Sequence, residues 1–134
     1  MSTRADASLE QVLAAAGARF AYLFGSRASG QARADSDADI AVMPTRELGL
    51  RAQARLAQGL ARALAVPDLD LVLLDRATLE LRGHIVQTGR LLFSADEPAR
   101  VAFEVRTRSE YLDFLPTLKA LERAYLAQVA RHGL

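Results

Sequence analysis

The chain has 134 residues, of which 51% are hydrophobic and 25% are charged, and its formal net charge is +1. This length favours one globular domain with a hydrophobic core of its own. Because the chain contains no cysteine, disulfides, zinc–thiolate sites, iron–sulfur clusters and cysteine nucleophiles are excluded. A net charge near zero gives the protein no overall positive potential to attract nucleic acid, so we expect no direct nucleic-acid binding.

The N-terminal segment does not resemble a secretory signal. It carries Arg4, Asp6 and Glu10 and has no apolar core. No apolar stretch reaches the roughly 18 residues that a membrane span needs. We therefore expect a cytoplasmic protein with no membrane association.

The apolar pattern predicts helices that alternate with short strands. In chain order we expect a helix over 8–17, strands over 20–24 and 39–43, a helix over 48–64, a strand over 69–74, a helix over 78–88, a strand over 90–94 and a helical tail from 97 to about 131. This order favours the α/β class, with a small mixed sheet flanked by helices and a C-terminal helical tail. The strands are mostly apolar, so we expect them to be buried on both faces.

Several residues predict where the helices begin, end or bend. Ser8 and Asp96 are suited to cap the first and last helices. Gly89 is suited to a left-handed cap. In the tail we expect an interruption near 106–109 and a bend at Pro116.

Two aspartates mark the start of the second strand. Asp37 and Asp39 are two residues apart, so their side chains point the same way along a strand and repel each other. The run 35–39 contains no lysine or arginine to compensate. A bound divalent cation would remove the repulsion, and carboxylates without histidine or thiol partners favour Mg²⁺ or Mn²⁺. Alternatively, the pair is a solvated cap or turn.

A third carboxylate interrupts the next apolar strand. Asp70 is the one charged residue in 69–74, and burying it costs free energy unless it is paired or ligates a metal. If this strand lies beside the strand of Asp39, the three carboxylates converge on a two-metal site for phosphoryl displacement. Two alternatives stay open: Asp70 lies at a sheet edge facing water, or Asp68 is the active carboxylate instead.

A glycine and a serine directly follow the first strand. Gly25 allows close approach of a ligand to the backbone, and Ser26 offers a hydroxyl and an N–H group. Together they are suited to bind phosphate if a helical turn starts there. Alternatively, they form a turn without a binding role. Arg27 and Arg33 flank this loop and either meet phosphates or are solvated.

These residues together resemble a known signature. Gly25-Ser26, ten residues, then Asp37-x-Asp39 is similar to the GS-x10-D-x-D element of the DNA polymerase β-like nucleotidyltransferase superfamily. The chain most resembles the minimal nucleotidyltransferase (MNT) family, small prokaryotic proteins paired with HEPN-domain toxins. Further similarity covers the segments 69–77, 81–85, 89–93, 103–104 and 111–114.

The resemblance implies an activity and a set of roles. A single MNT domain would span 1–134, with a catalytic core over about 1–96 and a tail over about 97–134. It would transfer AMP from ATP to a tyrosine of a cognate HEPN ribonuclease toxin and so act as an antitoxin. Gly25 and Ser26 would bind the nucleotide phosphates, and Asp37, Asp39 and Asp70 would be the catalytic residues that hold two Mg²⁺ ions, or Mn²⁺.

Two other functions remain open from the sequence. One is an antitoxin that neutralises the toxin by binding alone, and the other is a nucleotidyltransferase for small molecules. The tail adds a related question, because it carries an apolar stripe made of Tyr111, Phe114, Leu115, Leu118, Leu121, Tyr125 and Leu126. Either this stripe packs on the sheet, or part of it forms a partner or self-association surface.

Overall fold

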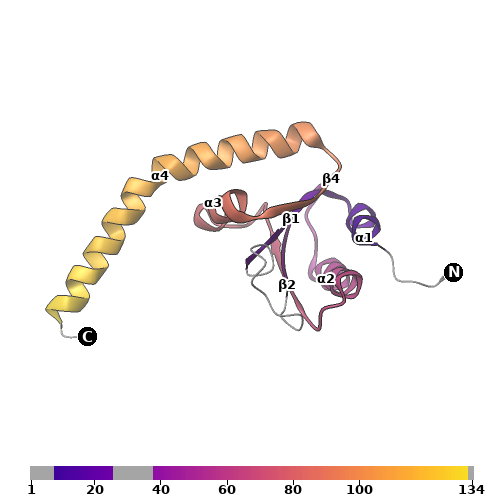
Figure 1. Ribbon diagram of the computed structural model, residues 1–134, viewed down its shortest axis with the longest axis horizontal. Coiled ribbons are helices and arrows are strands. Elements are labelled where there is room, and N and C mark those ends of the chain that lie inside the picture. Colours follow the sequence, from indigo (N-terminus) through magenta and orange to yellow (C-terminus); the bar gives the residue numbers. More distant parts are fainter. Residues whose placement is uncertain (1–7, 26–37, 133–134) are drawn as a thin grey trace.

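A four-stranded sheet with helices on both faces forms the body of the molecule in the computed structural model, which describes residues 8–25 and 38–132 (Figure 1). In chain order its elements are α1 (Leu9–Ala15), β1 (Ala18–Phe24), β2 (Ala38–Pro44), α2 (Leu50–Leu64), β3 (Leu69–Leu73), α3 (Leu79–Thr88), β4 (Arg90–Ser94) and α4 (Glu97–Arg131). Each expected helix and strand is present within two residues of its expected ends. The predicted α/β class is therefore confirmed.

The sheet is mixed and has the strand order β3-β2-β1-β4. β1 pairs antiparallel with β2 and β4, whereas β2 and β3 run parallel. A parallel pair needs a crossover connection, which α2 supplies between β2 and β3. This topology places the two aspartate-bearing strands next to each other.

Each face of the sheet has its own apolar layer, because side chains alternate along every strand. On one face, the fully buried Leu13 of α1 and Leu60 of α2 pack with residues of β1 and β2. On the other face, Phe20 and Ile85 pack with Phe103 of α4. Helices therefore cover both faces, but α3 and α4 cover a different face from α1 and α2.

Burial differs between the central and the outer strands. β1 and β2 are mostly buried, whereas β3 and β4 are largely half-buried or exposed. The expectation that all strands are buried on both faces is wrong for β3 and β4. These two form the edges of the sheet, where each strand has one neighbour and the flanking helices extend less far.

The helix starts follow from local hydrogen bonding. The Ser8 hydroxyl accepts from the Gln11 backbone N–H at 3.2 Å, and the Gln11 side chain accepts from the Ser8 N–H at 2.9 Å, which forms a capping box. Asp96 accepts from the Ala99 N–H at 3.1 Å. Both predicted N-caps are confirmed.

Gly89 ends α3 for a reason other than the one predicted. Its φ is −75°, which is extended rather than left-handed, so the predicted left-handed cap is wrong. A Cβ atom at this position would lie 2.5 Å from the Ile85 carbonyl oxygen and 3.3 Å from that of Leu23. Glycine is needed because the chain passes close to other backbone as α3 leads directly into β4.

α4 is one continuous helix of 35 residues, so the expected interruption near 106–109 is wrong. Thr107 is only 2% exposed in this stretch. The Tyr111 ring packs so closely on α3 that a Cβ atom at Gly83 would lie 2.6 Å from its Cγ. Packing against α3 keeps this segment helical. Pro116 lies inside the helix, and Figure 1 shows α4 bending in its middle.

A partly buried hydrogen bond fixes the first part of α4 to the sheet. The Tyr22 hydroxyl donates to Glu104 Oε2 at 2.6 Å, and Arg100 Nη1 donates to the same oxygen at 2.9 Å. Tyr22 is 3% exposed, and its burial, followed by the hydrogen bond to Glu104, raises its pKa well above the ordinary value. The start of α4 is therefore tied to the central strand β1.

The second part of α4 extends away from the sheet (Figure 1). Its apolar residues Leu121, Tyr125 and Leu126 are 59%, 65% and 63% exposed. The alternative in which the whole stripe packs on the sheet is therefore wrong for these residues. Despite the length of α4, none of the helices in the described residues is apolar enough to cross a membrane.

Candidate active site

Two carboxylates from neighbouring strands lie at one end of the sheet. Asp39 of β2 and Asp70 of β3 are paired in the parallel register. Paired residues on adjacent strands project to the same face, with strands about 4.8 Å apart. The structure thus brings together two of the three aspartates predicted from the sequence.

Gly25, directly after β1, lies next to Asp39 and is the third described residue of this site. It follows β1, whose last residue, Phe24, pairs with Asp39. Its φ is +77°, and a Cβ atom there would overlap Oδ2 of Asp39 and lie 3.3 Å from its Cγ. Only glycine allows this left-handed backbone to lie against the carboxylate without strain.

Asp70 is exposed, which corrects the expectation of a carboxylate enclosed in an apolar strand. β3 is an edge strand, so its residues have solvent on one side. The sequence alternative of an edge residue facing water describes Asp70 correctly. The predicted free-energy cost of burying it therefore does not apply.

Asp68, the competing carboxylate, has a local structural contact. Its Oδ1 accepts from the Leu69 backbone N–H at 2.8 Å, at the start of β3. The register pairs Asp70, rather than Asp68, with Asp39. This geometry favours Asp70 as the partner of Asp39.

The remaining predicted site residues, Ser26 and Asp37, lie outside the described residues, as do Arg27 and Arg33. In the described part of the chain, no three histidine, cysteine or acidic side chains form a potential metal cluster. The described site therefore consists of Gly25, Asp39 and Asp70.

Comparison with known proteins agrees with this arrangement of strands. The sequence model of the family described as polymerase beta, nucleotidyltransferase, matches residues 8–98. The chain belongs to this nucleotidyltransferase family. The matched region includes β1 to β4 and every predicted site residue.

Relatives of this nucleotidyltransferase include a protein from Shewanella oneidensis. The chain is 40% identical over 90 residues to the protein adenylyltransferase MntA of that organism. The alignment covers 67% of this chain and 63% of the relative, so the chain matches less than two thirds of that protein's length.

Two solved structures of nucleotidyltransferase relatives match most of the chain. A toxin–antitoxin crystal structure with AMP-PNP has a chain that is 34% identical, with a TM-score of 0.68 over 90% of this chain and 94% of that chain. A second is a complex of a tri-AMPylated HEPN toxin with MNT antitoxin, from Shewanella oneidensis. Its matching chain is 32% identical, with a TM-score of 0.64 over 90% of this chain and 91% of that chain.

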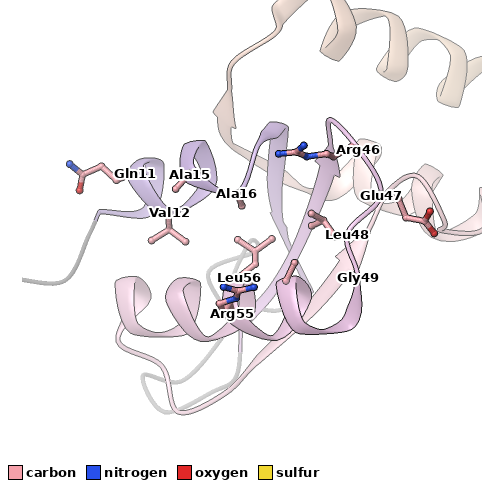
Figure 2. Close-up of a pocket in the computed structure, with 11 residues that line it drawn as sticks. Gln11, Val12, Ala15, Ala16, Arg46, Glu47, Leu48, Gly49, Arg55 and Leu56 are labelled. Carbon is pink, nitrogen blue, oxygen red and sulfur yellow. The ribbon is translucent and has the colours of Figure 1, made fainter.

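The nucleotidyltransferase chain also has a cavity that the sequence did not predict. It has a volume of about 570 Å³ and lies between α1, the segment after β2 and the start of α2 (Figure 2). α1 and α2 pack on the face of the sheet opposite to Asp39 and Asp70, so this cavity is separate from the candidate active site. The sequence of α2 contains three arginines and no acidic residue, but nothing in that pattern indicates a cavity.

Proposed function

We propose that this chain is a Mg²⁺-dependent nucleotidyltransferase that transfers AMP from ATP to a protein hydroxyl group. The observation that supports this most is the pairing of Asp39 with Asp70 beside the left-handed Gly25. Family membership supports nucleotidyl transfer. The adenylyltransferase relative and the structures with AMP-PNP and a tri-AMPylated toxin support AMP as the transferred group.

The phosphate-binding part of the site is assigned to Gly25 and Ser26. Because Gly25 has no side chain, its backbone lies directly against the Asp39 carboxylate, so a triphosphate held at that carboxylate would lie next to the backbone of this turn. Ser26 would donate its hydroxyl and N–H groups to phosphate oxygens. The acceptor hydroxyl would attack the α-phosphorus, and the bond to the β-phosphate would break to release pyrophosphate.

The carboxylates present fit a divalent metal ion. Asp39 and Asp70 are oxygen donors in register on one face, and Asp37 is two residues from Asp39 in the sequence. An all-oxygen donor set is suited to Mg²⁺, and also to Mn²⁺. We assign Asp37, Asp39 and Asp70 to two such ions, which when bound neutralise phosphate charge and lower the pKa of an attacking hydroxyl.

Asp70 is in a suitable position to meet the acceptor. It is exposed on the edge strand β3, so a hydroxyl group on another protein can approach it from solvent. Gly25 and Asp39 lie next to and on the central strands β1 and β2, respectively. We therefore assign nucleotide binding to the side of the site next to the central strands and acceptor binding to the side next to the edge strand β3.

We propose that the acceptor is a tyrosine of a cognate HEPN-domain ribonuclease toxin. We assign 1–134 to a single MNT domain, in which about 1–96 is the catalytic core and about 97–134 is the tail. The exposed side chains of Leu121, Tyr125 and Leu126 support a role of the tail in protein docking. AMP transfer would silence the toxin, which makes this chain an antitoxin that acts in the cytoplasm.

The proposal can be tested by transferring label to the partner from ATP. The chain, Mg²⁺ and the co-expressed partner are incubated with ATP labelled at either the α- or the γ-phosphate. We expect the partner to acquire the α-label and not the γ-label, because AMP is transferred and pyrophosphate leaves. Transfer of γ-label would indicate a kinase. Loss of partner ribonuclease activity without transfer of either label would indicate an antitoxin that acts by binding alone.

A further inference from the structure

A groove opens between α1 and α2 on the face of the sheet away from the candidate active site. The two helices are in close contact at Val12 and Gly59, where a Cβ atom on the glycine would lie 3.0 Å from Val12 Cγ1. Toward the start of α2 they are separated by the cavity of about 570 Å³ (Figure 2). Its floor is apolar, with Ala15, Ala52 and Leu56 among the lining residues.

Positive charge borders this apolar floor from two sides. Arg46 comes from the segment after β2 and Arg55 from α2, and both are exposed (Figure 2). In the part of the chain that the structure describes, neither guanidinium pairs with an acidic side chain. The nearby Glu47 is paired with Arg76 at 2.9 Å. The guanidinium groups of Arg46 and Arg55 are therefore available to pair with an anionic ligand.

The positive charge continues along α2 beyond the cavity. Arg51 is exposed and lies four residues before Arg55, so both are on the same side of the helix. A basic surface that extends one helical turn past the cavity favours a protein segment over a small molecule as the occupant.

We propose that this groove binds an acidic amphipathic helix of a partner protein. An apolar side chain of that helix would enter the cavity, and its carboxylates would pair with Arg46 and Arg55. A nucleic acid fits less well, because none of the described residues that line the groove is aromatic and could serve as a stacking surface for bases. The surface is separate from the site of AMP transfer, so the proposal does not depend on catalysis.

A synthetic peptide probes the groove directly. The probe is a fluorescein-labelled helix with leucines at helical spacing on one face and glutamates elsewhere, and its control carries lysine in place of every glutamate. Fluorescence anisotropy with the full chain should show binding of the glutamate peptide and none of the lysine peptide. No binding of the glutamate peptide up to about 1 mM, or equal binding of both, would overturn the proposal.

Two double variants with equal charge change locate the binding surface. Arg46→Glu with Arg55→Glu should weaken binding of the glutamate peptide about tenfold or more. Arg106→Glu with Arg123→Glu, at exposed positions of α4, should change it less than about twofold. Equal weakening by both would show general charge attraction and contradict the proposal.

Variants that fill the cavity test whether its shape, and not only the nearby positive charge, is needed for peptide binding. Ala52→Trp places a large side chain in the cavity, whereas Ala54→Trp places it on the exposed side of the same helix. We expect only the first to block the peptide.

Amide chemical shifts of the unmodified chain, recorded as the glutamate peptide is added, locate the binding surface without any variant. Shifts confined to α1, the segment after β2 and α2 would support the groove, and shifts confined to α4 would refute it.

Discussion

Gly25 lies so close to Asp39 that any side chain at position 25 would overlap the carboxylate. The chain turns at this point with φ +77°, which glycine adopts at little cost and other residues at about 1–2 kcal/mol. The end of β1 and the start of β2 can therefore meet around an acidic group without a side chain between them. This contact leads to a test that separates backbone strain from site chemistry.

Gly25→Ala should lower AMP transfer about 100-fold, because even a small displacement of a reacting group is costly. The control is Gly17→Ala. Gly17 has nearly the same φ, +76°, but apart from its neighbours in the chain the nearest described atom to an added Cβ would be Thr45 Oγ1, at 4.0 Å. Both variants should lose about 1–2 kcal/mol in the free energy of unfolding. Comparable losses of activity in both would show that Gly25 matters only for folding.

Asp39→Asn and Asp70→Asn should each reduce Mg²⁺-dependent AMP transfer about 100-fold or more, since each removes a carboxylate that we assign to the metal ions. Asp75→Asn, an exposed aspartate in the turn after β3, is the control and should keep full activity. Without metal, Asp70→Asn should melt no lower than the unmodified chain, because it removes one of two like charges in register. Retained activity in either site variant would contradict the assignment.

The bond between Tyr22 and Glu104 predicts a change of stability with pH. Because the pKa of Tyr22 is raised in the folded state, its contribution is fully present below the unfolded pKa of about 10 and is lost as pH rises above it. Urea denaturation should therefore show a fall in the free energy of unfolding as the pH rises from about 10 to about 12. Tyr22→Phe should lower that free energy by about 1–2 kcal/mol at neutral pH and flatten this fall. An equally steep fall in the variant would mean that another group titrates.

The exposed end of α4 should contribute to partner binding more than to folding. Leu121→Ser with Leu126→Ser changes two residues that are 59% and 63% exposed, so the free energy of unfolding should change by less than about 0.5 kcal/mol. Affinity for the partner should fall about tenfold or more. The matched control is Ala124→Ser with Ala127→Ser on the same helix. Unchanged affinity in the leucine variant, measured by calorimetry, would place the docking surface elsewhere.

Local chemistry explains why much of this fold could be predicted from the sequence. Ser8 and Asp96 begin helices through hydrogen bonds to residues only three positions away. The pairing of Asp39 with Asp70 could be predicted because each stands out in an apolar strand, and the strand that follows a crossover often pairs with the one before it. The structure confirms that these two aspartates are in register.

The features that were predicted incorrectly depend on contacts distant in sequence. Asp70 is exposed because β3 is an edge strand, and the residues of one strand do not reveal its position in the sheet. Thr107 stays in a continuous helix because α4 packs on α3. Gly89 is constrained by the carbonyl of Leu23 as well as by its own helix. The groove between α1 and α2 likewise requires both helices to be placed on the sheet.

The intact mass of the partner protein tests the central claim most directly. The partner is incubated with this chain, ATP and Mg²⁺, in parallel with an Asp37→Ala/Asp39→Ala variant that should still bind it. We expect the partner's mass to increase by one or more AMP units with the unmodified chain and by none with the variant, together with loss of its ribonuclease activity only in the first case. An unchanged mass in both reactions, with equal inhibition of the ribonuclease by the two proteins, would contradict the account and identify an antitoxin that acts by binding.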